Sequence, residues 1–342
     1  MTEEMKAIGL YQHLPITNNE SLVDVSIPKP RASGHDLVVQ VKAVSVNPVD
    51  TKLRANGEEE ETPKILGYDA AGIVTEVGEK VTLFQPGDEV YYAGSIDRPG
   101  TNSAYHAVDE RIVGKKPATI TFEEAAAMPL TSLTAYEGLY DRLGISRQET
   151  DNEGKSILII GAAGGVGSIA TQIASRAGLT VIGTASREET ITWAQNHGAE
   201  YIINHHKALS TQLHDLGFPF VDYIFCLSST ADHWEEMVAS IKPQGKIASI
   251  VETEEPLNLT ALQSKSATFV WEFMFTRPLY QTEDMIEQHH ILSELCSLID
   301  KGYIDTTINE TIEGLTAHNL QEAHRLVESG KMIGKVVVTA KE

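Results

Sequence analysis

The sequence predicts an α/β fold in two domains, and three observations support this prediction. At 342 residues, the chain is longer than one ordinary hydrophobic core can enclose. Residues 5 to about 128 are rich in strand signals, whereas strands alternate with helical stretches from about residue 129. A glycine-rich turn joins a buried strand to a helix in the second region. We therefore expect one domain from residues 1–128, completed by about 280–342, and another from residues 129–279.

The first region reads as a compact antiparallel barrel. Residues 37–44 are rich in valine and alternate partly between apolar and polar side chains. Residues 71–78 form a strand signal that ends in a turn. The segment Gln85-Pro-Gly-Asp88 is typical of a turn, and it precedes a further strand signal at 89–92.

The second region reads as a parallel sheet, because its strand signals alternate with helical ones. The expected strands are residues 157–160, 180–184, 201–204, 222–226 and 246–250. Residues 267–275 are a candidate for a sixth strand at the edge, and a helix is expected around 282–300. The short tail 334–339 has a β pattern that suits the first domain, so we expect the chain to return there.

Composition excludes several classes of protein. Apolar residues make up 42% of the chain, and no run of about 18 of them indicates a membrane span. The start, Met-Thr-Glu-Glu-Met-Lys, lacks the basic and apolar regions of a secretory signal. Cys226 and Cys296 are too few for a disulfide framework or a four-cysteine zinc site. We expect a cytoplasmic protein.

The net charge of −21 argues against a nucleic-acid partner, because phosphate binding needs clustered lysine and arginine. The acidity is typical of a solubilising surface. Any polyanionic ligand must then be held by local dipoles and a few cations.

The glycine-rich turn runs Ile157-Leu-Ile-Ile-Gly-Ala-Ala-Gly-Gly-Val-Gly167. Helical spacing of apolar residues follows it, and a strand at 180–184 completes a βαβ unit. Glycines let a backbone approach a pyrophosphate, and the amides and dipole of the helix start attract its charge. Glycine clusters also occur in ordinary turns and caps, but the βαβ context favours a dinucleotide site. Ala162 stands where the usual pattern has its first glycine. The residues expected to bind the dinucleotide are Ala162, Gly164, Gly165, Val166 and Gly167.

Several motifs occur together along the chain. They are Ser45-Val-Asn-Pro-Val-Asp50, Leu66-Gly-Tyr-Asp-Ala-Ala-Gly72, Gln85-Pro-Gly-Asp-Glu-Val90, Ala126-Ala-Met-Pro-Leu-Thr-Ser-Leu-Thr-Ala135, the glycine turn and Gly330-Lys-Met-Ile-Gly-Lys335. This combined pattern resembles the medium-chain dehydrogenase/reductase superfamily, and within it the zinc-free quinone oxidoreductases and the zinc-type alcohol dehydrogenase-like proteins. The resemblance implies a GroES-like β-barrel catalytic domain and a Rossmann domain, a doubly wound parallel sheet, with a nicotinamide cofactor between them.

Zinc-dependent members of this superfamily hold their metal with a cysteine near position 47 and a His-Glu pair near 68–69. Here Asn47 and Tyr68 stand at those positions, and neither is a plausible zinc ligand. The four-cysteine structural lobe is also missing, since residues 93–110 contain no cysteine. The adjacent pairs His205-His206 and His289-His290 point apart on a strand or helix. We expect no native metal site.

Without a Lewis acid, an alkoxide is poorly stabilised, so alcohol oxidation is disfavoured. The sequence favours a reductase that passes a hydride to quinones or conjugated carbonyl compounds. Two alternatives stay open: a non-catalytic NADPH-binding sensor or structural protein, and zinc-dependent alcohol dehydrogenase chemistry.

The cofactor is expected to be NADPH. NAD sites usually carry an acidic residue after the second strand, but here that strand leads into Ser186 and Arg187. Serine can donate to a 2′-phosphate, and arginine can pair with it. An alternative role for Ser186 is to cap the following helix, with Glu189 completing a capping box.

The resemblance places Asn47 and Asp50 in the loop that faces the nicotinamide. Asn47 could stabilise an oxyanion, although Asn-Pro followed by Asp is also ordinary turn chemistry. Lys52 stands where many quinone reductases carry a tyrosine. A solvated lysine is the favoured interpretation, with a cation for substrate or cofactor as the alternative.

Two more residues are expected near the cofactor. In the family, the segment containing Thr131 approaches the nicotinamide, and its hydroxyl could hold the carboxamide or a ribose; it could instead cap a helix after Pro129. Cys226, at the end of the fourth strand, is expected to line the cofactor cleft without acting as a nucleophile.

A homodimer is expected from residues 269–275, which form an apolar candidate edge. Such an edge is an aggregation hazard if left open, and the family pairs through the corresponding strand. The alternative is that these aromatic side chains pack inside one chain.

Overall fold

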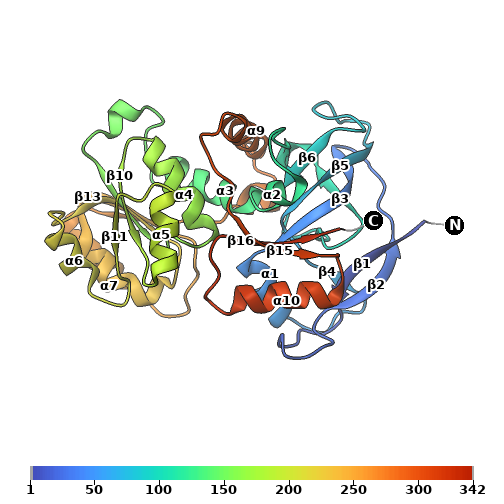
Figure 1. Cartoon of the computed structure of the whole chain (residues 1–342), viewed down its shortest axis with the longest axis horizontal. Helices are drawn as coiled ribbons and strands as arrows, with labels where there is room; N and C mark the ends of the chain where they lie inside the picture. The colour runs from blue at the N-terminus through green and yellow to red at the C-terminus, as the bar shows by residue number, and fades with distance from the viewer. Residues whose placement is uncertain (1–2, 341–342) are drawn as a thin grey trace. The chain divides into compact units, whose positions relative to one another are not determined.

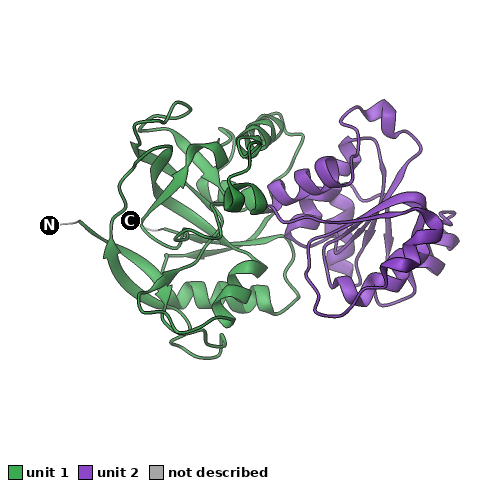
Figure 2. Cartoon of the chain, turned by 180° about the vertical axis from the view of Figure 1, so that it is seen from behind, with its two compact units in different colours: residues 1–130, 275–342 green, residues 131–274 purple. Residues whose placement is uncertain are grey.

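The computed structural model describes residues 3–340. The chain divides into two compact units, residues 1–130 with 275–342 and residues 131–274, coloured separately in Figure 2. The boundaries expected from the sequence were at 128/129 and about 279/280. The first unit is thus built from both ends of the chain, and the second from its middle.

Two sheets form the first unit. The smaller has the order β2-β1-β4, and the larger has the order β15-β16-β3-β5-β6-β8, with β7 also pairing β3. The pairs are antiparallel except for β15 with β16. The strands are β1 (Glu4–Leu10), β2 (Val23–Pro28), β3 (Asp36–Val46), β4 (Lys64–Ile65), β5 (Ala70–Val77), β6 (Glu89–Tyr92), β7 (Tyr105–Asp109), β8 (Val113–Lys115), β15 (Ile308–Glu313) and β16 (Lys335–Thr339).

The end of the chain completes this unit. Strand β16 pairs with β3, with Val336 opposite Val46, and all five of its residues are buried. Apolar side chains of the strands and of α10 make one core. The helices of the unit are α1 (Pro48–Ala55), α2 (Phe122–Ala126), α8 (Thr276–Tyr280), α9 (Glu287–Asp300) and α10 (Ala317–Glu328). The long helix α9 begins later than the expected residue 282.

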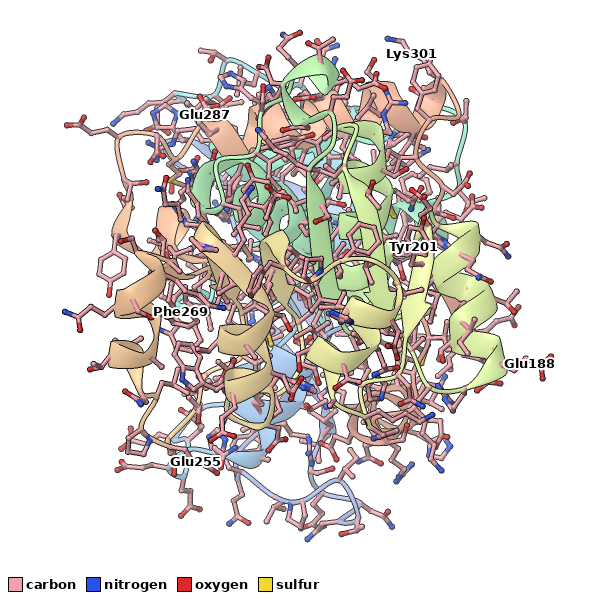
Figure 3. All side chains as sticks on the ribbon, turned by 90° about the vertical axis from the view of Figure 1, so that its left-hand side faces the viewer. Glu188, Tyr201, Glu255, Phe269, Glu287 and Lys301 are labelled. Atoms are coloured by element: carbon pink, nitrogen blue, oxygen red, sulfur yellow. The ribbon has the colours of Figure 1, made fainter. Side chains whose placement is uncertain are left out.

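A six-stranded parallel sheet forms the second unit (Figure 1). Figure 3 labels Tyr201 and Phe269, which belong to the strands at its two opposite edges. The strands are β9 (Ser156–Ile160), β10 (Thr180–Thr184), β11 (Tyr201–Ile203), β12 (Val221–Cys226), β13 (Ile241–Ser249) and β14 (Thr268–Trp271). The expected edge strand exists, but it ends at Trp271 rather than at residue 275.

Two helix pairs cover the sheet. Helix α4 (Gly165–Arg176) contacts α5 (Glu188–Asn196) and packs against β9 and β10, while α6 (Leu209–Asp215) contacts α7 (Thr230–Ser240), which packs against β12 and β13. Helix α3 (Pro129–Tyr136) continues as a π-helical turn, Glu137–Arg142. None of the helices within residues 3–340 is long and apolar enough to cross a membrane.

The strand order β11-β10-β9-β12-β13-β14 positions the site. The chain moves outward from β9 to β11 and then returns to β12 on the other side of β9, so the order reverses between β9 and β12. Ligands of doubly wound sheets bind at the carboxyl ends of the strands at this switch point. The glycine turn follows β9, and Cys226 ends β12.

Candidate functional site

The glycine turn is tied to the end of the neighbouring strand. Gly161 has φ +91°, a conformation that side-chain-bearing residues rarely adopt. Its amide donates to Thr184 Oγ1 at 2.9 Å, and the amide of Ala162 donates to Thr184 O at 3.3 Å. The turn is therefore fixed by β10 rather than by its own sequence alone.

Two glycines of the turn serve different purposes. A Cβ on Gly167 would lie 2.2 Å from Gly161 O, so only glycine lets the helix pack this closely on the turn. A Cβ on Gly164 would meet its nearest atom only at 3.5 Å. The protein itself therefore does not exclude a side chain at Gly164, and the partly exposed backbone there can be approached by a ligand.

The first amides of α4 are available to a ligand. The first bond at the helix start runs from Ser168 N to Gly164 O at 2.9 Å, and the amides of Gly165, Val166 and Gly167 come before it. The first turn carries no acidic side chain. The amides of this first turn, the helix dipole and the approachable backbone at Gly164 fit a pyrophosphate.

Ser186 and Arg187 lie between β10 and α5. Arg187 is the residue before the first helical turn, and its amide donates to Thr190 Oγ1 at 3.1 Å. The alternative capping box from Ser186 to Glu189 is therefore wrong, because the helix begins one residue later and Thr190 supplies the cap. Ser186 is left without a capping role at this helix.

The Arg187 guanidinium lies at the surface. Its Nη1 is 2.6 Å from Glu189 Oε1, with side chains 39% and 60% exposed. Figure 3 shows the neighbouring Glu188 pointing outward at the periphery of this unit. An exposed ion pair is weak, so a phosphate group can displace Glu189 as the partner of Arg187.

Cys226 is fully enclosed at the end of β12. Burial raises the pKa of its thiol to about 11, and Sγ donates to Ser228 O at 3.4 Å. A buried thiol of raised pKa is a poor nucleophile. Cys226 thus stands at the switch point, but its enclosed side chain offers no surface of its own to a ligand.

In the first unit, Asp50 links two loops. Its Oδ2 accepts the amide of Asn47 at 2.7 Å, and its Oδ1 accepts the amide of Gly67 at 3.0 Å. The first bond closes the start of α1, and the second ties that start to the segment before β5. Burial, the largest influence, raises the pKa of Asp50 to about 7, against the lowering effect of its amide donors and Lys335.

A buried polar cluster joins Asn47 to Asp69 and Lys335. Asn47 Nδ2 donates to Asp69 Oδ2 at 2.8 Å, and Lys335 Nζ donates to Asp69 Oδ2 at 3.1 Å and also to Asn47 Oδ1. The other oxygen of Asp69 accepts the amide of Leu130 at 2.8 Å. Burial raises the pKa of Asp69, while the ammonium group and the hydrogen bonds lower it. The Asn47 amide is thus held inside the protein.

Tyr68 lies beside this cluster. Its ring meets that of Phe275 edge-on with centroids 5.3 Å apart, and its side chain is buried. Burial, and then the carboxylates of Asp50 and Asp97, raise the pKa of its hydroxyl far above the ordinary value.

Thr131 and Lys52 complete the expected residues. Thr131 is the third residue of α3 and is buried, so it is not the N-cap that the alternative interpretation suggested. Lys52 is exposed in the last turn of α1.

Sequence families match both parts of the chain. The alcohol dehydrogenase GroES-like domain matches residues 33–134, and the zinc-binding dehydrogenase domain matches residues 165–288. A zinc-type alcohol dehydrogenase-like protein of Staphylococcus epidermidis (strain ATCC 12228 / FDA PCI 1200) is 46% identical over 337 residues, which are 98% of this chain and 100% of that protein. The chain belongs to the medium-chain dehydrogenase/reductase superfamily.

Solved structures of medium-chain dehydrogenase/reductases share the whole fold. A Rhizobium etli CFN 42 protein, provisionally described as a zinc-dependent alcohol dehydrogenase, is 47% identical, with TM-score 0.96 and full coverage of both chains. The Escherichia coli quinone oxidoreductase complexed with NADPH is 26% identical, with TM-score 0.81 and coverage of 98% of this chain and 99% of that one. The fold is therefore a GroES-like domain with a Rossmann-like parallel sheet, and the protein is a nicotinamide-dependent oxidoreductase.

The sequence analysis of this medium-chain dehydrogenase/reductase assigned no role to Asp69 or Lys335. A signal for Lys335 was present, since a lysine opens the apolar run Lys-Val-Val-Val of β16. A buried lysine needs an anionic partner, but the sequence does not say which one. Within residues 3–340, no group of three histidine, cysteine or acidic side chains is arranged to hold a metal ion.

Proposed function

We propose that this protein is an NADPH-dependent oxidoreductase that reduces quinones or conjugated carbonyl compounds by hydride transfer without zinc. The observation that carries the proposal is the Lys335 ammonium group between Asn47 and Asp69. In zinc-dependent members, the metal lies against the residues at positions 47 and 68. Here the buried carboxylate next to Tyr68 already has a cation from the chain itself, and a second cation beside it would be repelled.

Named residues would hold the cofactor. The amides of Gly165, Val166 and Gly167 would bind the pyrophosphate, with Ala162 and Gly164 forming the floor of the turn. Ser186 and Arg187 would bind the 2′-phosphate, and the strand end at Cys226 would line the cleft. When bound, the nicotinamide supplies a hydride and its electron pair.

Asn47, Asp50 and Thr131 are the proposed residues near the reacting atoms. An asparagine amide has two N–H donors, and one of those of Asn47 goes to Asp69. We propose that the other stabilises an acceptor oxygen. Asp50 would hold the loop, and the Thr131 hydroxyl would hold the carboxamide or a ribose.

The proposed class of acceptor follows from the hydrogen-bond donors that the protein supplies. Amide and hydroxyl donors suffice for an anion that is delocalised, as in an enolate or a hydroquinone, but they stabilise a localised alkoxide poorly. The named activity of the Escherichia coli relative supports quinones as acceptors. We also propose a homodimer that forms through the edge strand β14, and a location in the cytoplasm, which suits two free cysteines.

The test follows NADPH absorbance with a panel of quinones, enones and aldehydes, and the reverse reaction with NADP⁺ and primary alcohols. We expect turnover with quinones or enones and little with alcohols. Robust alcohol oxidation with no quinone or enone activity would overturn the proposal. No activity with any acceptor would favour a cofactor-binding sensor instead.

Elemental analysis tests the metal-free part of the proposal. The protein is purified without a metal-binding tag, and we expect no stoichiometric zinc. About one zinc per chain that resists a chelator would contradict it.

A further inference from the structure

Tyr68 carries a hydroxyl that no group among residues 3–340 binds, on a ring that is almost fully enclosed. Its side chain is 2% exposed, yet among residues 3–340 no group donates to or accepts from its hydroxyl. Two other buried tyrosines of the same unit are satisfied: Tyr91 donates to Leu292 O at 2.6 Å, and the Tyr92 hydroxyl lies 3.1 Å from His106 Nδ1. The Tyr68 hydroxyl has no protein partner and is not one of the fully enclosed atoms, so it keeps accessible surface and can meet a small molecule.

The segment that carries Tyr68 is held rigidly. Gly67 has φ +107°, and a Cβ there would lie 2.5 Å from Thr101 Oγ1. The amide of Gly67 donates to Asp50, and its carbonyl accepts the amide of Thr101 at 2.9 Å. With Phe275 against the ring, the phenol is fixed in one place before any ligand arrives. A fixed donor costs no reorganisation when charge develops on a ligand.

The surroundings keep the phenol protonated. The carboxylates of Asp50 and Asp97 face it, and burial adds to their effect in raising its pKa. At neutral pH, Tyr68 therefore keeps its proton. Its hydroxyl donates to neither carboxylate, so the proton is available to a ligand.

We propose that the Tyr68 hydroxyl is the catalytic donor to the oxygen of the acceptor. The inference rests on the proposed function and names the proton donor that this function requires.

The step balances as follows for a conjugated carbonyl compound. The acceptor's β-carbon gains the hydride, and the electron pair of its C=C bond moves so that negative charge develops on the carbonyl oxygen. The Tyr68 O–H bond breaks, and an O–H bond forms on the acceptor, giving an enol. Water then returns a proton to the phenolate. The oxidised cofactor and the reduced acceptor are the products.

The variant Y68F tests this with Y91F as the matched control, since both remove one hydroxyl from a buried ring. We expect kcat/KM of Y68F to fall about a hundredfold or more, with unchanged NADPH affinity in a fluorescence titration. Because its hydroxyl has no protein partner, Y68F should melt no lower than the natural protein. Y91F should melt lower and keep its kcat/KM. Natural turnover in Y68F, or a fall in its melting temperature like that of Y91F, would contradict the proposal.

A spectroscopic readout does not depend on turnover. The probe is 4-(dimethylamino)cinnamaldehyde bound together with NADP⁺, whose absorption moves to longer wavelength when its oxygen accepts a hydrogen bond. We expect this shift in the natural protein and in Y91F, and its loss in Y68F. An equal shift in Y68F would refute the role of Tyr68 while leaving the proposed function intact. Absence of NADPH oxidation with every acceptor would instead remove the proposed function, and this inference with it.

Discussion

Lys335 and Asp69 form a buried ion pair between the last strand of the chain and the segment before β5. Nζ lies 3.1 Å from Oδ2, and the two side chains are 4% and 0% exposed. Removing one partner of such a pair leaves a buried charge without compensation. Lys335 also donates to Asn47, so the pair fixes the loop that carries the proposed site.

Replacing Lys335 by methionine should therefore destabilise the first unit by about 3–5 kcal/mol. Urea unfolding followed by far-UV circular dichroism measures this. The control is R325M, which breaks the exposed pair of Arg325 with Glu322 and should cost less than about 1 kcal/mol. Equal losses of stability in K335M and R325M would show that the buried pair contributes no more than an exposed one.

Asn47→Ala should lower turnover by about ten- to a thousandfold while NADPH affinity stays the same. The physical reason is the loss of the amide donor proposed to meet the acceptor oxygen. K335M is the comparison, because it disturbs the cluster but keeps the amide. If both variants lose turnover equally, Asn47 acts only through the cluster.

Arg187→Ala should weaken NADPH binding about ten- to a hundredfold, with little change for NADH. The loss is that of a charge-assisted bond to the 2′-phosphate. Titration of protein fluorescence with each cofactor measures it, and R176A, at the exposed end of α4, is the control. Equal affinity of the natural protein for NADPH and NADH would contradict the proposed binding of the 2′-phosphate by Arg187.

Glu137 and Glu272 predict a pH-dependent stability of the second unit. Both are buried and close enough for their charges to interact, and Arg142 Nε donates to Glu272 Oε2 at 2.8 Å. Burial and then the Glu137 charge raise the pKa of Glu272 from 4.5 to about 9. A group with a raised pKa contributes stability below its unfolded pKa, and this contribution is lost as pH rises through the folded value. Stability should therefore fall between about pH 4.5 and pH 9.

The variant E137Q removes the like charge and can still donate to Glu272. Its melting temperature should fall less between pH 7 and pH 9 than that of the natural protein. The exposed Glu235 of α7 offers a control, since E235Q should keep the natural slope. Parallel curves for all three proteins would rule out the carboxyl pair as the cause.

The edge strand β14 predicts the assembly. Trp271 and Phe273 are each 45% exposed at or beside this edge, next to Glu272, which is buried. We expect a dimer at micromolar concentration in sedimentation, and a monomer for W271E. Y303E, which changes an exposed tyrosine of the other unit, should stay dimeric. A natural protein that sediments as a monomer would count against the dimer.

The sequence predicted the features that depend on local pattern. The turn at 161–167 and the alternation that builds the parallel sheet are encoded within a few residues of each other, and so is the β pattern of 334–339. Only the alternative cap at Ser186 would start this helix one residue early, because both Ser186 and Thr190 can cap and the fold decides between them. The expected apolar strand was interrupted at Glu272, whose partners Glu137 and Arg142 lie far away in sequence.

The polar cluster could not be predicted in the same way. Asn47 and Lys335 are 288 positions apart, and no local period connects them. Tyr68 was recognised only as a residue unsuited to zinc. That its hydroxyl lacks a partner emerges only when every neighbouring group is in place.

The first unit draws its last strand, β16, from the end of the chain. During synthesis, residues 1–130 leave the ribosome first, yet their larger sheet lacks β15 and β16, and Asp69 lacks its ammonium partner, until residues 308–339 follow. The middle unit is continuous in sequence, so all its strands have been synthesised before residues 308–339, and it can fold before the first unit is complete. Translation thus completes the middle unit before the unit that carries Tyr68, and a nascent chain stalled before residue 335 holds an unfinished first unit.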